Sequence, residues 1–156
     1  MIRLNLEGVG QVEETDSILL VLRAPEVNQL LVIETGLLEG QAVALEVEGV
    51  RAERPLTHDL LHAIIEGLGA RIREVRIQDF YDETFFAQVV LTRAANGLAT
   101  LEFDARPSDA VALAVRAGAP IYASEEVMEE AGITEEPAGR FAALFEDDPR
   151  GDRVIH

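Results

Sequence analysis

Cysteine is absent from the 156-residue sequence. Its absence excludes a disulfide framework, a thiol nucleophile and a metal site built on thiolates. The sequence also lacks any run of about 18 uncharged apolar residues, the length that a membrane-spanning helix needs. Residues 1–7 do not form the long apolar segment of a secretory signal. We therefore expect a soluble, cytoplasmic protein with no membrane partner.

Lysine is also absent, so all 13 basic residues are arginine, and 29 acidic residues bring the net charge to −16. Proteins that coat nucleic acid non-specifically normally carry a basic surface, so the overall charge argues against that class. Eight of the arginines lie in residues 50–123, where they nearly balance ten acidic residues. A nucleic-acid substrate would therefore be bound locally, by a few arginines or through divalent cations, rather than through a basic surface.

Apolar residues follow two kinds of spacing along the chain, and together these predict an α+β fold. Short or alternating apolar runs indicate strands, and apolar residues at helical spacing indicate helices. The expected strands are residues 2–12, 17–23, 29–34, 71–78, 85–92, 99–102 and 119–122. The expected helices are residues 37–48, 57–68 and 125–131, and one that begins after Ser108.

A repeat links the two halves of the chain. The sequence of residues 42–47 returns, with one change, at residues 110–115. Each copy lies in an expected helix that follows three expected strands. We infer a duplicated β-β-β-α unit that forms a mixed or antiparallel sheet, with the helix 57–68 inserted between the copies. The alternative is two core helices that resemble each other only because both are rich in alanine and valine.

The inserted helix and the end of the chain give two further expectations. The apolar stripe of the helix should face the core; its members are Leu60, Leu61, Ile64, Ile65 and Leu68. The dipeptide at residues 96–97, Asn-Gly, predicts a hairpin turn. We divide the chain into a domain at residues 1–133 and an acidic tail at 134–156. The tail is either mobile or docks a short helix through Phe141, Leu144 and Phe145.

Two short clusters each place an arginine and a proline before an expected helix. The upstream cluster is residues 54–59 (Arg-Pro-Leu-Thr-His-Asp), and the downstream cluster is residues 104–109 (Asp-Ala-Arg-Pro-Ser-Asp). Thr57 and Ser108 are expected to cap the helices, with Pro107 just outside its helix. An aspartate then falls in each first turn, where the helix dipole favours negative charge. Arginines and free N–H groups at a helix start suit a phosphate or carboxylate.

Acidic residues also gather between two expected strands, at Asp79, Asp82 and Glu83. These residues can simply form a solvated hairpin turn. Alternatively, Asp79 or Asp82 joins Asp104 or Asp109 as ligands of Mg²⁺ or Mn²⁺, which prefer carboxylate oxygens.

Three ordered motifs, residues 54–61, 79–87 and 104–113, resemble those of the bifunctional nuclease domain family. The resemblance covers roughly residues 1–133. It implies an α+β domain around a mixed sheet, a homo-oligomer with a dimer favoured, and nuclease activity on DNA and RNA.

The chemistry of these residues gives a first hypothesis, a metal-assisted phosphodiesterase. The expected catalytic residues are His58, Asp59, Asp104 and Asp109. The expected ligands of Mg²⁺ or Mn²⁺ are Asp79, Asp82, Asp104 and Asp109, and the expected phosphate-binding residues are Arg54, Arg106 and Ser108. His58 would serve as the base or the leaving-group acid near neutral pH.

The second hypothesis is a non-catalytic module that binds a small anion or a partner protein and takes part in assembly. In it the same arginines and aspartates are structural ion pairs that hold two helix starts against the sheet. The two hypotheses differ in whether the carboxylates converge in an open cleft or are sealed between helices.

Overall fold

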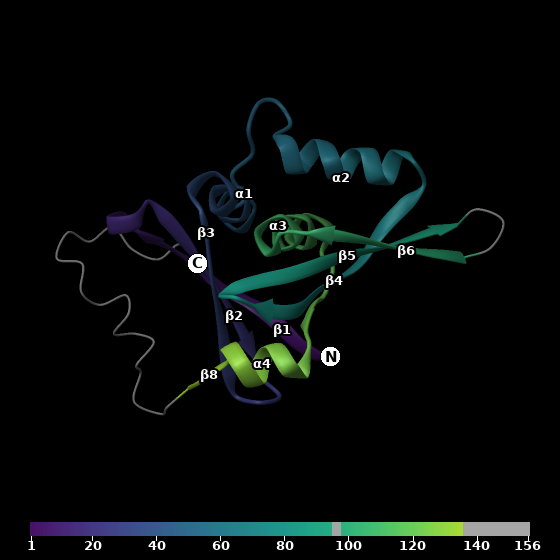
Figure 1. Ribbon diagram of the computed structural model, residues 1–156. Helices are drawn as coiled ribbons and strands as arrows, with labels where there is room; N and C mark the ends of the chain where they lie inside the picture. The colour runs from purple at the N-terminus through teal and green to yellow at the C-terminus, as the bar shows by residue number, and fades with distance from the viewer. Residues whose placement is uncertain (95–97, 136–156) are drawn as a thin grey trace.

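The computed structural model describes residues 1–94 and 98–135, and its described part contains four helices and an eight-stranded mixed sheet (Figure 1). The strands are β1 (Ile2–Val12), β2 (Ser17–Ala24), β3 (Gln29–Gly36), β4 (Ala70–Tyr81), β5 (Thr84–Ala94), β6 (Leu98–Ala105), β7 (Ile121–Ala123) and β8 (Ile133–Thr134). The helices are α1 (Leu37–Val47), α2 (Thr57–Gly67), α3 (Pro107–Ala117) and α4 (Glu125–Ala131), with a 3₁₀ turn at Glu13–Thr15. The predicted α+β class is confirmed.

The sheet consists of two antiparallel meanders joined by a short central strand. Its order is β6-β5-β4-β7-β1-β2-β3-β8, and β7 pairs antiparallel with β1 and parallel with β4. Each three-stranded meander is followed by an 11-residue helix, α1 in one case and α3 in the other. This order agrees with the inferred β-β-β-α repeat, with α2 between the copies, while the origin of the two units by duplication stays a hypothesis.

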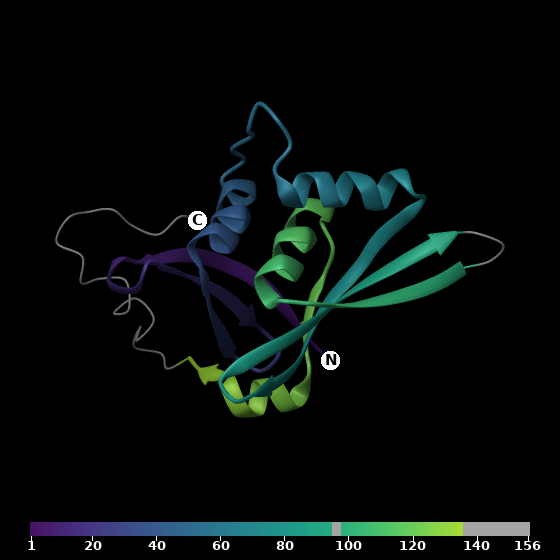
Figure 2. The same ribbon diagram turned by 45° about the horizontal axis from the view of Figure 1, so that its top comes forward.

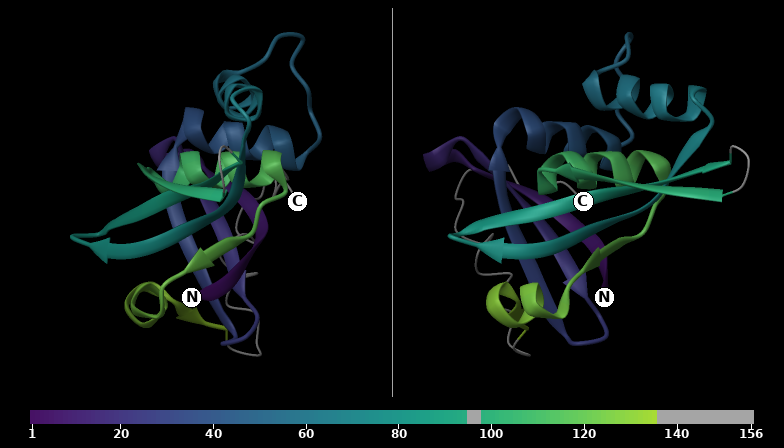
Figure 3. Two further views of the ribbon diagram at one scale, coloured as in Figure 1. Left: turned by 90° about the vertical axis from the view of Figure 1, so that its right-hand side faces the viewer. Right: turned by 45° about the vertical axis from the view of Figure 1, so that its right-hand side comes forward.

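The two repeated segments lie on α1 and α3, which pack against each other. Ala42, Val43 and Ala44 are buried on α1, as are the residues of α3 from Ala110 to Ala114. Small side chains let the two helices lie side by side, as Figure 2 shows, and pack onto the fully buried Leu20 and Val75 of the sheet. Both views of Figure 3 place α1, α2 and α3 on one side of the molecule and α4 on the other.

The prediction that the apolar stripe of α2 faces the core is wrong for all but one of its residues. Leu60, Leu61, Ile64 and Leu68 are between 41% and 68% exposed, and only Ile65 packs against the core. Apolar periodicity identifies one face of a helix but not what covers that face. Helix α2 lies outside the α1–α3 pair and contacts α3 and β4 along a narrow strip, so most of its apolar face stays open.

The predicted caps are displaced by one residue at α2 and two at α3. Arg106 occupies the N-cap position of α3 and Pro107 is the first helical residue, so Ser108 lies buried in the first turn and caps nothing. The fixed φ of proline suits that first position. The N-cap of α2 is Leu56, not Thr57, and its N–H donates to Asp59 Oδ2 at 2.9 Å. Helix α4 does have a side-chain cap, since Ser124 Oγ accepts from the N–H of Val127.

The remaining sequence expectations fall at turns and at the end of the chain. Asp82 and Glu83 form the β4–β5 turn with positive φ angles of 50° and 56°, whereas Asp79 lies within β4. The Asn-Gly turn at 96–97 and the tail helix lie outside the described residues. Thr134 pairs with Gln29 of β3, so the described fold continues past residue 133, and the division of the chain there stays a prediction. None of the helices described is long and apolar enough to cross a membrane.

Candidate functional site

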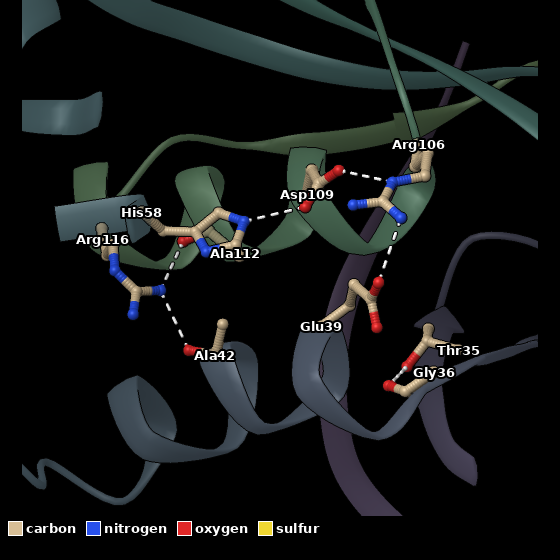
Figure 4. Close-up of polar contacts among 9 residues, drawn as sticks. All are labelled: Thr35, Gly36, Glu39, Ala42, His58, Arg106, Asp109, Ala112 and Arg116. Carbon is tan, nitrogen blue, oxygen red and sulfur yellow. Dashed lines mark hydrogen bonds and ion pairs between the residues drawn. The ribbon is translucent and has the colours of Figure 1, made fainter. Parts of the chain in front are cut away.

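The first turns of α1, α2 and α3 are joined by one chain of hydrogen bonds, drawn in Figure 4. Arg106 Nε donates to Asp109 Oδ2 at 2.8 Å, and Arg106 Nη1 donates to Glu39 Oε1 at 3.0 Å. His58 Nε2 lies 2.8 Å from Asp109 Oδ1. We call Glu39, His58, Arg106 and Asp109 the first-turn cluster. It brings together the upstream and downstream clusters of the sequence and adds a carboxylate from α1.

Asp109 is the centre of the first-turn cluster, because both of its carboxylate oxygens are bonded. Burial alone would raise the pKa of Asp109, but the hydrogen bonds with Arg106 and His58 outweigh burial and hold that pKa below its ordinary value. Asp109 is therefore an anion at neutral pH. With two carboxylates and one guanidinium, the cluster has one net negative charge when His58 is neutral, and none when His58 is protonated.

A second ion pair fixes the start of α2 from the other end of α3. The Arg116 side chain is 4% exposed, and its Nε donates to Asp59 Oδ1 at 2.7 Å. Its Nη1 also donates to the carbonyl oxygens of Ala42 and Ala112, each at 3.0 Å. The pKa of Asp59 is lowered first by the N–H of Leu56 and then by Arg116. Arg116 thus connects all three helices at one point.

The first-turn cluster lies in the wall of an open cavity of about 980 Å³. Most of the remaining wall is apolar and comes from α1, α2, α3, β5 and β6; examples are Leu38, Leu56, Leu61, Val89, Phe103 and Leu113. Acid–base groups beside an apolar, solvent-open cavity are an arrangement typical of a ligand site. The carboxylates are therefore neither sealed between helices nor free, since they face a cavity but are already paired.

The remaining predicted site residues lie apart from this cluster. Arg54 is exposed before α2 and forms no ion pair with the described residues. Asp104 is part of the cavity wall, between Phe103 and Ala105 on β6. These two apolar neighbours lie on the face of the sheet that the helices cover. Because side chains alternate along a strand, the carboxylate of Asp104 lies on the opposite face. Asp79 and Asp82 are exposed on β4 and at its turn.

The predicted metal ligands are therefore not assembled into one site. Within residues 1–94 and 98–135, no three histidine, aspartate or glutamate side chains are grouped so as to hold a metal ion. Asp109, the one predicted ligand in the first-turn cluster, has no oxygen left unbonded.

Two residues of the site were not singled out in the sequence. Arg116 follows Asp109 by two helical turns, on the same side of α3, and that spacing is a usable signal. Glu39 is 67 residues from Arg106, and only the packing of α1 against α3 brings them together.

The chain belongs to the bifunctional nuclease domain family, whose family model matches residues 20–136. An uncharacterized protein of Mycobacterium tuberculosis is 40% identical over 126 residues, which are 81% of this chain and 73% of that protein.

Two plant proteins are more distant relatives. Bifunctional nuclease 1 of Arabidopsis thaliana is 29% identical over 93 residues, 60% of this chain and 29% of that protein. Bifunctional nuclease 2 of Oryza sativa subsp. japonica is 28% identical over 140 residues, 88% of this chain and 43% of that protein. The chain thus spans less than half of either plant protein.

Proposed function

We propose that this protein hydrolyses phosphodiester bonds in DNA and RNA, with His58 as the acid–base residue. Membership of the bifunctional nuclease domain family supports the reaction class. The observation that carries the assignment of residues is the contact between His58 Nε2 and Asp109 Oδ1, 2.8 Å long, in the wall of an open cavity.

In this mechanism Asp109 orients the imidazole ring of His58. When Nε2–H is donated to Asp109, Nδ1 is the nitrogen that exchanges a proton with water or with the leaving oxygen. The ionised Asp109 also stabilises the imidazolium that forms during the transfer, as a carboxylate does in other histidine-based sites.

Arg106 is the proposed contact for the phosphate group. Its side chain is 66% exposed, and its Nε and Nη1 are held by Asp109 and Glu39, which leaves Nη2 without a partner among the described residues. A guanidinium fixed in this way presents a directed donor to an anionic oxygen. Arg54, exposed just before α2, is the second proposed phosphate contact.

A role for Mg²⁺ or Mn²⁺ stays a prediction. Each oxygen of Asp109 already makes one contact, with Arg106 or with His58, so a cation bound there would share these oxygens with them. The described residues do not group the four predicted ligands, so we derive no step through a metal ion.

The pairing of the carboxylates also supports a second candidate function. Asp59 and Asp109 are each bonded to an arginine, and their bonds link α1, α2 and α3. In that case the ion pairs are structural, and the protein is a non-catalytic module that binds an anion or a partner.

Self-association is part of either proposal, and the exposed apolar face of α2 supports it. Contiguous exposed apolar patches on a folded protein often mark an interface.

The deciding experiment is cleavage of labelled single-stranded DNA and RNA by the purified protein and two variants, His58→Ala and Asp109→Asn. We expect the rate to fall by about 10²-fold or more in both, because each removes proton transfer by His58 in its correct orientation.

His62→Ala is the matched control, because His62 lies one turn further along α2 and pairs with Glu66 instead. It should cleave at the wild-type rate. Undiminished cleavage by His58→Ala would refute the assignment of His58, whereas absence of cleavage by the wild-type protein would leave the binding module as the better account.

A further inference from the structure

Phe103 is a half-exposed aromatic residue in the same cavity wall as Arg106, the proposed phosphate contact. It lies on β6, an edge strand of the sheet, three residues before Arg106. The residue is 51% exposed and lines the cavity, next to Val89 of β5. A phenylalanine side chain is normally covered, so the exposed half of this one is available for contact with whatever enters the cavity.

The cavity around Phe103 suits a flat, weakly polar group. Leu38, Leu56 and Leu61 form part of its wall and are themselves exposed, so the cavity presents apolar surface to solvent. Its volume of about 980 Å³ is at the upper end of the range for small-molecule sites.

Charge alone cannot hold a nucleic acid here. The whole chain has a net charge of −16, and Arg106 is shared between two carboxylates. The usual affinity from release of phosphate counterions is therefore small at this site. Binding energy for a polyanion must come largely from contacts with its bases.

We propose that the cavity binds an unpaired nucleobase, stacked on Phe103, while the adjoining phosphate contacts Arg106. This inference rests on the proposed nuclease function and adds its substrate class, single-stranded nucleic acid. Stacking of a base on an aromatic side chain contributes about 1–3 kcal/mol. Extracting a base from a duplex costs a few kcal/mol, so a paired base gains nothing by entering.

The test uses binding, which is independent of cleavage. Since the chain contains no tryptophan, Phe103→Trp introduces a single tryptophan at the site, whose emission is followed under selective excitation. The variant is titrated with three probes: a short oligo(dT), an abasic oligonucleotide with the same number of phosphates, and the duplex of that oligo(dT) with oligo(dA). Gel analysis after each titration confirms that the probes are intact.

We expect oligo(dT) to quench the tryptophan and to bind about tenfold more tightly than the abasic strand or the duplex. Phe103→Leu keeps an apolar side chain but has no tryptophan, so its binding is measured by the fluorescence anisotropy of labelled probes; it should bind oligo(dT) about as weakly as the abasic strand. Arg106→Ala should weaken the binding of both strands by a similar factor.

Other outcomes separate the two proposals. Equal binding of oligo(dT) and the abasic strand, with cleavage intact, overturns the base site and leaves the nuclease function standing. Failure of both strands to bind, together with absence of cleavage, overturns the proposed function and this inference with it. Tryptophan emission that shifts with protein concentration alone also overturns the base site, because a second copy then covers the cavity.

Discussion

Replacing Arg116 by methionine should destabilise the protein far more than the same replacement at Arg106. Arg106 is the N-cap of α3 and Arg116 lies in its last turn, and both pair with carboxylates. The Arg116 side chain is 4% exposed, whereas that of Arg106 is 66% exposed. Methionine keeps most of the length of the side chain, so the comparison isolates the guanidinium group and its hydrogen bonds. Comparison of the two variants tests whether burial determines how much an ion pair contributes to the stability of this fold.

The size of the expected loss of stability in Arg116→Met follows from the polar groups that lose a hydrogen-bond donor. The carbonyl oxygens of Ala42 and Ala112 each lose the donor that Arg116 adds to their helix, and the carboxylate of Asp59 keeps only the N–H of Leu56. Breaking a buried ion pair costs about 3–5 kcal/mol, but Asp59 is 37% exposed and regains some water, which lowers the expected loss to roughly 2–4 kcal/mol.

Thermal unfolding followed by circular dichroism measures this difference. For a chain of this size the loss corresponds to a fall in melting temperature of roughly 5–15 °C for Arg116→Met. Arg106→Met should melt within a few degrees of the wild type, because exposed ion pairs contribute little. Equal shifts for the two variants would refute the view that Arg116 connects the three helices.

Three further predictions concern acid stability, metal dependence and assembly. Folding lowers the pKa of Asp59 and that of Asp109, so the stabilisation from both is complete above the ordinary carboxyl pKa and is lost as pH falls through the folded-state values. The free energy of unfolding, measured with urea at a series of pH values below about 5, should therefore decline less steeply for Asp59→Asn than for the wild type. If a divalent cation assists cleavage, EDTA should stop the cleavage of single-stranded DNA and excess Mn²⁺ should restore it, whereas activity that persists in EDTA would count against the predicted metal. Leu60→Asp and Ile64→Asp should lower the mass measured by light scattering if the exposed face of α2 joins two copies, and an unchanged mass would place the interface elsewhere.

Much of the fold could be predicted because its elements follow local rules. The strands have alternating or short apolar runs, and the helices α1 and α3 carry a visible repeat at residues 42–47 and 110–115. The positions of the caps were missed because Arg-Pro-Ser and Leu-Thr-His contain a good capping residue one or two positions after the true N-cap. Proline at the first helical position was the better guide at α3.

Part of the first-turn cluster could be anticipated, because its residues stand in two similar motifs that each begin a helix. His58 and Asp109 each stand in a helix first turn, and the two motifs do meet, as the sequence suggested. The partner of Arg106 on α1 could not be foreseen, since it depends on how two distant helices pack. The sequence could have indicated which face of the sheet the Asp104 side chain occupies. Side chains alternate along a strand, so Asp104 lies on the face opposite to that of the apolar Phe103 and Ala105.

The strand β7 has a consequence for how the protein is made. It is three residues long, yet it supplies the ladder between β1 and β4, pairing Ile121 with both Leu4 and Val75. On the ribosome both meanders are therefore synthesised before the strand that unites them, and each exposes an unpaired edge until residues 121–123 emerge. Closure of the sheet waits for contacts between the two ends of the described chain, which are slow to form. A nascent chain that stalls before Ile121 would carry two open sheet edges, each able to pair with another chain.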